Sequence, residues 1–285
     1  MGYLIFVSLL WGFSFGLIKN QLTGLDPNFV SFVRLSLAFL VFLPWLKLKD
    51  VPHKLELLLI GALQFGIMYM AYIFSYRYLK AYQVALFTIF TPIYVSLLDD
   101  ILKRKFNALH FGVALLSVLG TAIIVWTQAL NKILWVGFFL VQISNLCFAI
   151  GQIYYRKYRG KETRLIAEVH IFALLYLGAV IVTGSAALFT TNPANLAVTP
   201  NQWLTLGYLG IIASGLGFFL WNFGATKVNV GALAVFNNLK IPLAILIALL
   251  FFGEQTNLWR LLIGGTIITI ALWFNETKAK EDSAI

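Results

Sequence analysis

Hydrophobic segments occupy almost the whole of this chain. About ten apolar stretches, each long enough to cross a bilayer, follow one another between Tyr3 and Phe274. A spanning helix needs roughly 20 mostly apolar residues, because the hydrocarbon core of a bilayer is about 30 Å thick. Within lipid every backbone amide must be paired inside its own segment, so such stretches form helices. The sequence therefore predicts an all-α membrane protein that acts between its helices.

Ten transmembrane helices are expected, separated by turn and capping signals. Asp26-Pro27-Asn28 precedes the second helix, and Thr199-Pro200-Asn201 precedes the eighth. Proline and Asn or Asp together are strong turn signals. The expected ranges are 3–19, 29–47, 55–76, 83–102, 106–127, 133–155, 165–189, 202–225, 231–252 and 258–275.

The basic residues of the connections are distributed unequally between the two ends of these helices. Ten helices place both termini on one side, together with the connections after helices two, four, six and eight. That side holds fourteen Lys and Arg residues, and the other holds five: Lys19, Arg77, Lys80, Lys132 and Arg260. An excess of Lys and Arg marks the cytoplasmic face. Both termini are predicted to be cytoplasmic.

The composition excludes several classes of protein. Hydrophobic residues make up 60% of the 285 residues and charged residues only 11%, whereas soluble domains carry about 25% charged residues. The formal charge of +10 lies mostly in loops, where it sets orientation, so no nucleic-acid partner is expected. The single cysteine, Cys147, lies in an apolar stretch and is interpreted as a buried structural thiol.

The chain also divides into two similar halves, 1–130 and 131–285, which together form one integral membrane unit. Pro92 and Pro242 lie 150 residues apart, and Trp126 and Trp273 lie 147 apart. Acidic residues follow each proline: Asp99 and Asp100 in the first half and Glu254 in the second. A repeat of five helices is odd, so the second copy must enter the membrane inverted. Inverted repeats are a frequent plan of secondary transporters, with the site between the copies.

Several short motifs are those of a known transporter group. They are Leu10-Trp11-Gly12 with Lys19, Arg34, the helices of Pro92 and Pro242, and Gly253-Glu254 before a Gly-rich last helix. With these residues the chain resembles the drug/metabolite transporter superfamily, in its ten-helix, two-repeat branch of EamA-type permeases. The resemblance covers essentially the whole chain.

Within that superfamily, residues 61–70, 86–94, 141–151 and 213–226 are most similar to the bacterial biotin-uptake permeases. The resemblance implies import of biotin, by alternating access, across the cytoplasmic (inner) membrane of a bacterium. It implies a small-molecule substrate and surrounding membrane lipids, without a cofactor, a metal or enzymatic chemistry. A monomer or a homodimer is compatible with it.

Polar and aromatic residues within the spans are the candidates for binding substrate. Polar side chains deep in a bundle are costly and usually face its interior, and pockets combine aromatic walls with a few polar groups. In the resembled fold, helices one, three, four, six, eight and nine line the central cavity. The candidates are Trp11, Tyr69, Tyr72, Phe87, Gln142, Asn145, Trp221, Asn222, Asn237, Asn238 and Lys240.

Lys240 is the sharpest of these candidates, because it lies ten residues into an apolar helix. An ammonium near the midplane costs at least about 2.5–3.5 kcal/mol on insertion scales, and a bound carboxylate would offset that cost. The structural alternative is that Lys240 pairs with a backbone carbonyl freed by Pro242, or snorkels. Asn145, Asn237 and Asn238 are interpreted as partners of a ureido ring or, alternatively, as interhelical hydrogen bonds of about 0.6 kcal/mol each.

Other residues favour structural interpretations. Arg34 is placed nearer the outer end of the second helix, where snorkelling is expected. His170, beside Glu168, is interpreted as structural rather than as a proton relay. Four tryptophans near helix ends are interpreted as interface anchors: Trp126, Trp135, Trp203 and Trp259.

Rival functions remain at this stage. An exporter of amino acids or other small metabolites is the main alternative, since direction cannot be read from residues. A membrane enzyme would need a nucleophile with a base or a metal-binding motif such as H-E-x-x-H, which is absent. A channel filter would need recurring rings of polar residues. No carboxylate is expected mid-membrane, so proton coupling is not visible in the sequence.

Overall fold

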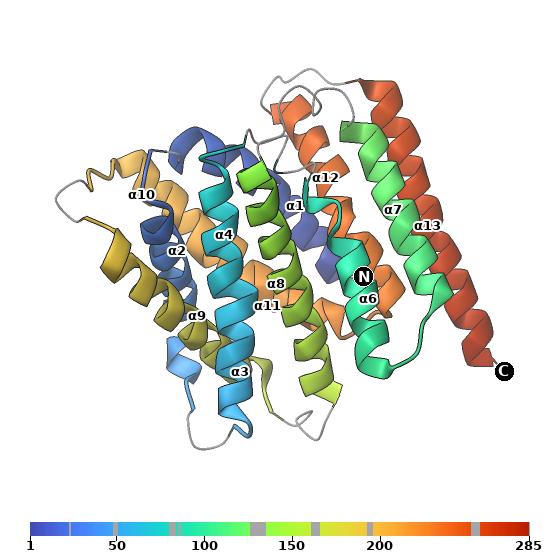
Figure 1. Cartoon of the computed structure of the whole chain (residues 1–285), viewed down its shortest axis with the longest axis horizontal. Helices are drawn as coiled ribbons and strands as arrows, with labels where there is room; N and C mark the ends of the chain where they lie inside the picture. Colours follow the sequence, from blue (N-terminus) through green and yellow to red (C-terminus); the bar gives the residue numbers. More distant parts are fainter. Residues whose placement is uncertain are drawn as a thin grey trace.

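The computed structural model describes residues 1–22, 24–47, 51–79, 84, 87–125, 135–160, 166–192, 196–251 and 257–284, and within these residues all regular structure is helical (Figure 1). The first half contains α1 (Gly2–Leu17), α2 (Pro27–Phe42), α3 (Lys54–Gly61), α4 (Met68–Ser75), α6 (Thr91–Lys103) and α7 (Ala108–Val125). Three short segments extend these helices: the π-helices η1 (Ile18–Leu22) and η3 (Ala62–Ile67) and the 3-10 turn η2 (Leu43–Trp45).

The second half contains α8 (Trp135–Gly160), α9 (Glu168–Thr190), α10 (Pro200–Gly207), α11 (Gly217–Ala225), α12 (Val230–Phe251) and α13 (Leu258–Ala284). A π-helix, η7 (Tyr208–Leu216), joins α10 to α11. The expectation of an all-α protein is confirmed. The expected start of the fourth helix near residue 83 and the Gly253-Glu254 motif lie outside the described residues, and α13 extends nine residues beyond its expected end at 275.

Seven helical stretches of the described residues are long and apolar enough to cross a membrane, which is the pattern of a multi-spanning protein. They are Gly2–Leu22, Pro27–Trp45, Lys54–Ser75, Trp135–Gly160, Glu168–Thr190, Pro200–Ala225 and Leu258–Lys278. Two shorter apolar helices accompany them, Ala108–Ile123 and Val230–Leu243. Trp135, Trp203 and Trp259 are exposed near helix ends, as interface anchors require, and Trp126 lies outside the described residues.

Local capping explains where two of these helices begin. Asp26 accepts hydrogen bonds from the backbone N–H groups of Asn28 and Phe29, at 3.1 and 3.0 Å, and Pro27 begins α2. Thr199 and Gln202 form a reciprocal capping box at the start of α10. Each cap satisfies backbone donors that have no partner within the helix. Both turn signals recognised in the sequence therefore mark true helix starts.

Close approach between α3 and α9 depends on two glycines. A Cβ added at Gly61 would lie 1.8 Å from the carbonyl oxygen of Leu175, and one added at Gly178 would lie 2.0 Å from that of Leu58. Small residues let helix backbones meet in membranes, where packing and not the hydrophobic effect drives association. The two glycines therefore allow α9 to pack closely against α3. Through η3, α3 continues into α4, which carries residues that line the cavity.

Two π-helical segments each join two α-helices, η3 between α3 and α4 and η7 between α10 and α11. A π-helix shifts the hydrogen-bond register and is frequent at functional sites. In η7 the carbonyl oxygen of Ala213 accepts from the Trp11 indole at 2.9 Å, and that of Ser214 accepts from the Tyr176 hydroxyl at 2.6 Å. The local unwinding thereby ties α1 and α9 to this part of the bundle.

Candidate functional site

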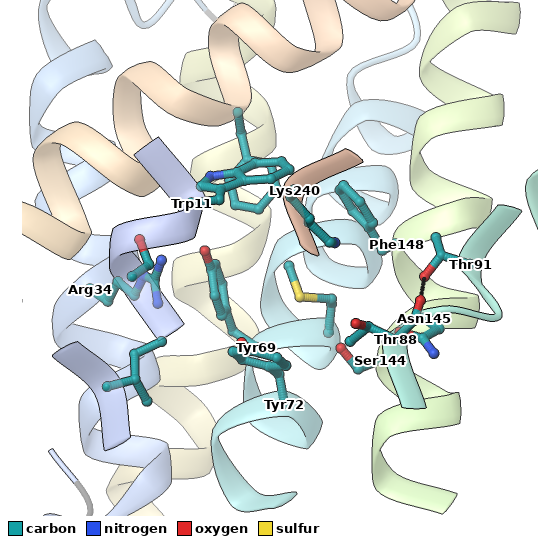
Figure 2. Close-up of a pocket in the computed structure, with 14 residues that line it drawn as sticks. Trp11, Arg34, Tyr69, Tyr72, Thr88, Thr91, Ser144, Asn145, Phe148 and Lys240 are labelled. Carbon is teal, nitrogen blue, oxygen red and sulfur yellow. Dashed lines mark hydrogen bonds between the residues drawn. The ribbon is translucent and has the colours of Figure 1, made fainter. Parts of the chain in front are cut away.

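A cavity lies between the helices at the centre of the bundle (Figure 2). Its walls come from α1, α2, α4, the start of α6, α8, α11 and α12, so both halves of the chain contribute. The lining combines aromatic rings with hydroxyl groups, one amide and two cations. The lining residues are Trp11, Ser14, Ile18, Arg34, Met68, Tyr69, Tyr72, Thr88, Thr91, Ser144, Asn145, Phe148, Phe218 and Lys240.

The ammonium of Lys240 lies between two aromatic rings. Its Nζ is 5.7 Å from the ring centroid of Trp11 and 5.7 Å from that of Phe148. The side chain is only 8% exposed, and it has no ion pair and no hydrogen bond to a carbonyl among the described residues. This placement disfavours both structural alternatives, snorkelling and pairing with a freed carbonyl. Cation–π attraction offsets part of the burial cost but leaves the charge without a counter-ion.

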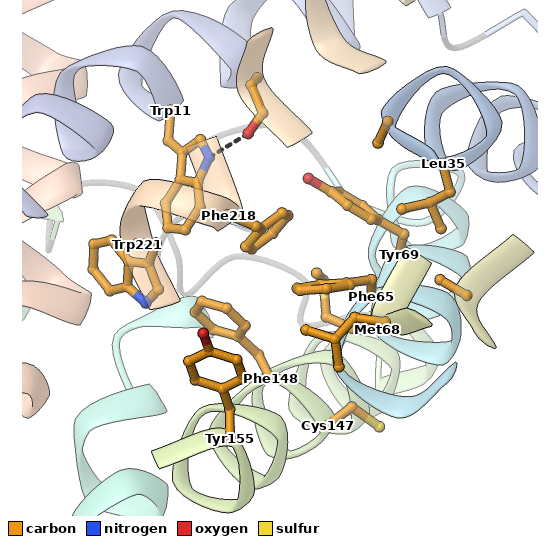
Figure 3. Packing of buried hydrophobic residues seen from close by; sticks show 14 of the residues in the cluster. Trp11, Leu35, Phe65, Met68, Tyr69, Cys147, Phe148, Tyr155, Phe218 and Trp221 are labelled. Carbon is orange, nitrogen blue, oxygen red and sulfur yellow. Dashed lines mark hydrogen bonds between the residues drawn. The ribbon is translucent and has the colours of Figure 1, made fainter. Parts of the chain in front are cut away.

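The aromatic wall around Lys240 is built from residues of α1, α8 and α11 (Figure 3). The Trp11 ring lies 4.8 Å from Trp221, 4.9 Å from Phe218 and 5.9 Å from Phe148, measured between ring centroids. Trp221 is fully buried behind Trp11 and does not line the cavity. The bond from the Trp11 indole to the Ala213 carbonyl fixes the orientation of that ring. The wall can therefore present fixed ring faces to a planar solute.

For Arg34, the interpretation from the sequence as a snorkelling residue near a helix end is wrong. It is the eighth residue of the 16-residue helix α2 and is only 2% exposed, so it does not snorkel. Its Nε donates to the Ser214 hydroxyl at 2.7 Å, and its guanidinium carbon lies 4.1 Å from the ring centroid of Tyr69. The signal that could have found it is its residue type, because a cation within an apolar span is a functional candidate by default.

The helix that precedes Pro92 is interrupted at residues 89–90, and side chains satisfy the carbonyls freed there. The Phe87 carbonyl accepts from Asn145 Nδ2 at 2.8 Å and from Gln142 Nε2 at 3.1 Å. The Ile89 carbonyl accepts from Asn238 Nδ2 at 3.0 Å. Proline cannot donate, and backbone carbonyls left unpaired in a membrane cost several kcal/mol. These amides therefore connect α8 and α12 to the interrupted helix, which is the interhelical hydrogen bonding given above as the structural alternative for Asn145 and Asn238.

A second group of buried amides lies behind the aromatic wall. Gln152 accepts from the Trp221 indole at 3.0 Å and from Asn237 at 3.3 Å. Gln64 and Asn222 exchange two hydrogen bonds, at 2.9 and 3.2 Å. Asn237, Trp221 and Asn222 are fully buried, and each is hydrogen-bonded to one of these glutamines. In this conformation they position the wall and do not reach the cavity.

His170 and Glu168 are engaged in contacts at the end of α9. His170 Nδ1 lies 2.7 Å from the carbonyl oxygen of Trp45, and Glu168 forms an ion pair of 3.0 Å with Arg159. Glu168 also accepts a hydrogen bond from the Tyr155 hydroxyl. These contacts agree with the structural interpretation of the pair.

Five of the eleven predicted residues line the cavity: Trp11, Tyr69, Tyr72, Asn145 and Lys240. The other six lie outside the lining: Phe87, Gln142, Trp221, Asn222, Asn237 and Asn238. Besides Arg34, the sequence did not point to Phe148 and Phe218, because nothing distinguishes them among 25 phenylalanines. Small hydroxyl residues such as Ser144 and Thr91 carry no sequence signal of their own, because Ser and Thr also bond to their own helix.

A cavity shared by two halves of a helical membrane protein is the usual setting for a transport site. Comparison with known families decides its class. The family model described as "EamA-like transporter family" matches residues 1–126 and again 135–280. The chain belongs to the EamA-like transporter family.

Curated relatives of this EamA-family chain cover nearly its whole length. A protein of Pseudomonas aeruginosa named "Probable biotin transporter" is 40% identical over 99% of each chain. Proteins named "Biotin transporter" from Salmonella typhimurium and from Escherichia coli K12 are each 39% identical over 96% of this chain and 92% of theirs. The chain is therefore a transporter and not an enzyme, and it is a multi-pass protein of the bacterial inner membrane.

A solved crystal structure also resembles this transporter. It superposes with a TM-score of 0.75 over 96% of this chain and 95% of the other, at 14% sequence identity. At that identity the likeness concerns the fold alone.

Proposed function

We propose that this transporter imports biotin through the central cavity. The observation that carries the proposal is the ammonium of Lys240, which has no ion pair among the described residues and faces a cavity walled by Trp11, Phe148 and Phe218. Biotin is a fused ring pair with a ureido group at one end and a carboxylate on a short aliphatic chain at the other. The names of relatives about 40% identical over nearly the full length support this substrate.

Lys240 is the residue that neutralises the carboxylate. A buried charge without a partner is strongly destabilising, and an ion pair with the substrate removes that penalty only while the substrate is bound. The aromatic rings pack against the fused rings, and Tyr69, Tyr72 and Asn145 contribute polar contacts along the same wall. Binding pockets for small molecules have this composition, with apolar walls and a few orienting groups.

Ten transmembrane helices in two inverted repeats of five, 1–130 and 131–285, form the scaffold of the proposal. The family model matches two stretches that correspond to these halves. The π-helices η3 and η7 begin at Ala62 and Tyr208, 146 residues apart, close to the spacing of the two prolines. A shared irregularity at a shared position supports an internal repeat.

The packing of helices supports the same repeat. α1 packs against α12, and its counterpart α8 packs against α6. α2 packs against η7, and the counterparts of these two elements in the other half, α9 and η3, also pack against each other. In both cases, exchange of each helix with the one five spans away in the expected series of ten gives a pair that is also in contact. Rocking of one repeat against the other would open the cavity to each side in turn, with both termini in the cytoplasm as the positive-inside rule requires.

Uptake of labelled biotin tests the proposal in cells that lack their own biotin transporter. The comparison uses the wild type, Lys240→Met and Lys227→Met, a lysine outside the cavity lining whose Nζ lies 5.0 Å from the ring centroid of Phe223. We expect saturable uptake for the wild type and the Lys227 variant, and at least about a tenfold loss for Lys240→Met, since about 1.4 kcal/mol of binding energy corresponds to tenfold.

Absence of saturable uptake in the wild type, with the protein present in the membrane, would remove biotin as the substrate. Normal uptake by Lys240→Met would leave the substrate standing and remove the role of the lysine.

A further inference from the structure

Arg34 presents a nitrogen that nothing in the described chain satisfies. Its Nη1 is buried without a hydrogen-bond partner, and no carboxylate among the described residues pairs with the guanidinium. The same side chain lines the cavity. A buried donor without an acceptor is destabilising, and more so when it is charged. A group that enters the cavity and accepts from Nη1 would remove this cost.

A chain of hydrogen bonds directs a second donor toward the cavity. Arg34 Nε can only donate, so the Ser214 hydroxyl oxygen accepts from it at 2.7 Å. The Ser214 hydroxyl then donates to the Tyr69 oxygen at 3.2 Å. The oxygen of Tyr69 is thus used as an acceptor, and its own O–H proton has no acceptor among the described residues. Tyr69 lines the cavity beside Arg34.

These two donors and Lys240 belong to different parts of the cavity wall. Figure 2 shows Arg34 and the Tyr69 hydroxyl toward one side and the Lys240 ammonium toward the other, beyond Trp11. Arg34 and Tyr69 come from α2 and α4, while Lys240 comes from α12. The cavity therefore has two polar anchors with aromatic surface between them.

The two anchors suit different acceptors. Lys240 is a compact charge without hydrogen bonds in the described chain, and a carboxylate is the group that neutralises it. Arg34 already donates Nε–H to Ser214, so the Nε edge of its guanidinium is not available for bidentate binding and a ligand must approach the Nη groups. What remains at this anchor is the Nη1 group of the guanidinium, which carries two N–H donors, and one phenol O–H. Two converging donors suit a single polarised carbonyl oxygen with two lone pairs.

We propose that Arg34, held by Ser214, and Tyr69 together bind the ureido oxygen of the substrate, while Lys240 binds its carboxylate. This assignment rests on the proposed function and deepens it, because it defines the orientation of the solute and the basis of its selection. A site that hydrogen-bonds a substrate oxygen rejects analogues that lack it.

Competition binding with two analogues tests the assignment. Purified full-length transporter in lipid nanodiscs binds labelled biotin against unlabelled biotin, 2-iminobiotin or biotinamide. In 2-iminobiotin a cationic imino group replaces the ureido oxygen, and in biotinamide a neutral amide replaces the carboxylate. We expect the wild type to prefer biotin over each analogue by at least about tenfold, which corresponds to about 1.4 kcal/mol.

Each anchor variant should lose one preference and keep the other. Arg34→Met is expected to lower the preference over 2-iminobiotin to within about threefold while the preference over biotinamide stays, and Lys240→Met is expected to do the reverse. Arg77→Met is the matched control, because Arg77 is an exposed arginine paired with Asp26 at 3.6 Å. Its binding profile should equal that of the wild type.

Three results would overturn the assignment. One is an Arg34→Met variant that keeps its preference over 2-iminobiotin or loses the preference over biotinamide instead. Should Arg34→Met fail to fold, Tyr69→Phe removes a single hydroxyl and should weaken biotin binding about five- to tenfold; unchanged affinity there is the second. The third is a wild type that binds no biotin, which overturns the proposed function as well.

Discussion

The two proline-containing regions of this transporter carry the same sequence signal and fold differently. Before Pro92 the helix is interrupted at residues 89–90 and restarts as α6 at Thr91, whereas α12 continues from Val230 to Phe251 with Pro242 inside it. A proline always removes one backbone donor, but neighbouring helices decide how the freed carbonyls are satisfied. A proline in a span therefore marks a place where backbone hydrogen bonding changes, but it does not specify whether the helix is interrupted or continues.

Asn238 and Lys240 lie two residues apart on α12, but one is bonded to another helix and the other faces the cavity. Asn238 donates to the Ile89 carbonyl and so secures the interrupted helix of the other half. Lys240 has no such partner among the described residues and faces the cavity. Of these two polar residues of α12, Asn238 therefore has a structural role and Lys240 is available to bind a ligand.

The strongest test of this division compares stability with binding in Lys240→Met. Removal of a buried charge that lacks a partner should raise the thermal stability of the ligand-free protein. The same change should abolish most of the stabilisation that biotin confers, since binding to the native state stabilises by mass action. Thermal unfolding in detergent with and without biotin measures both effects.

Lys240→Arg is the charge-retaining control and should keep part of the biotin-dependent shift. A ligand-free Lys240→Met protein that is less stable than the wild type by more than the error of measurement would show that the lysine is structural.

Asn238→Leu should produce the opposite behaviour, with a smaller overall effect. The Ile89 carbonyl would lose its donor in an apolar surrounding, so unfolding free energy should fall by about 1–3 kcal/mol. The affinity of the folded fraction for biotin should change less than about threefold, because Asn238 does not line the cavity. Chemical unfolding and equilibrium binding on the same preparation separate the two quantities.

Asn238→Asp keeps the size of the side chain but removes its N–H donors, so this matched variant should lose stability as well. An unchanged free energy of unfolding in Asn238→Leu would mean that the hydrogen bond to Ile89 does not contribute to stability.

The smallest expected effect distinguishes the two prolines directly. Pro242→Ala restores a backbone N–H inside a continuous helix, where it can bond to the carbonyl four residues earlier, and should stabilise by up to about 1 kcal/mol. Pro92→Ala restores an N–H in the first turn of α6, where no intrahelical acceptor exists, and should be nearly neutral. Parallel melting curves of the two variants decide this, and equal shifts would contradict the structural difference.

The all-helical membrane architecture, the capped starts of α2 and α10, and the position of Lys240 within an apolar span could all be predicted from the sequence. These features depend on local quantities: the length of an apolar run, the residues that begin a helix, and the cost of a charge in lipid. Each can be evaluated within about twenty neighbouring residues.

Which polar side chains face the cavity could not be predicted in this way, because it depends on contacts between residues far apart in the sequence. Arg34 meets Ser214 across 180 residues of sequence, and Asn238 meets Ile89 across 149. Asn145 and Asn238 both donate to a carbonyl of the interrupted helix, yet only Asn145 also lines the cavity. Hydrogen bonding in an apolar surrounding must be satisfied somewhere, and the partner is set by how the two halves pack, which no local pattern records.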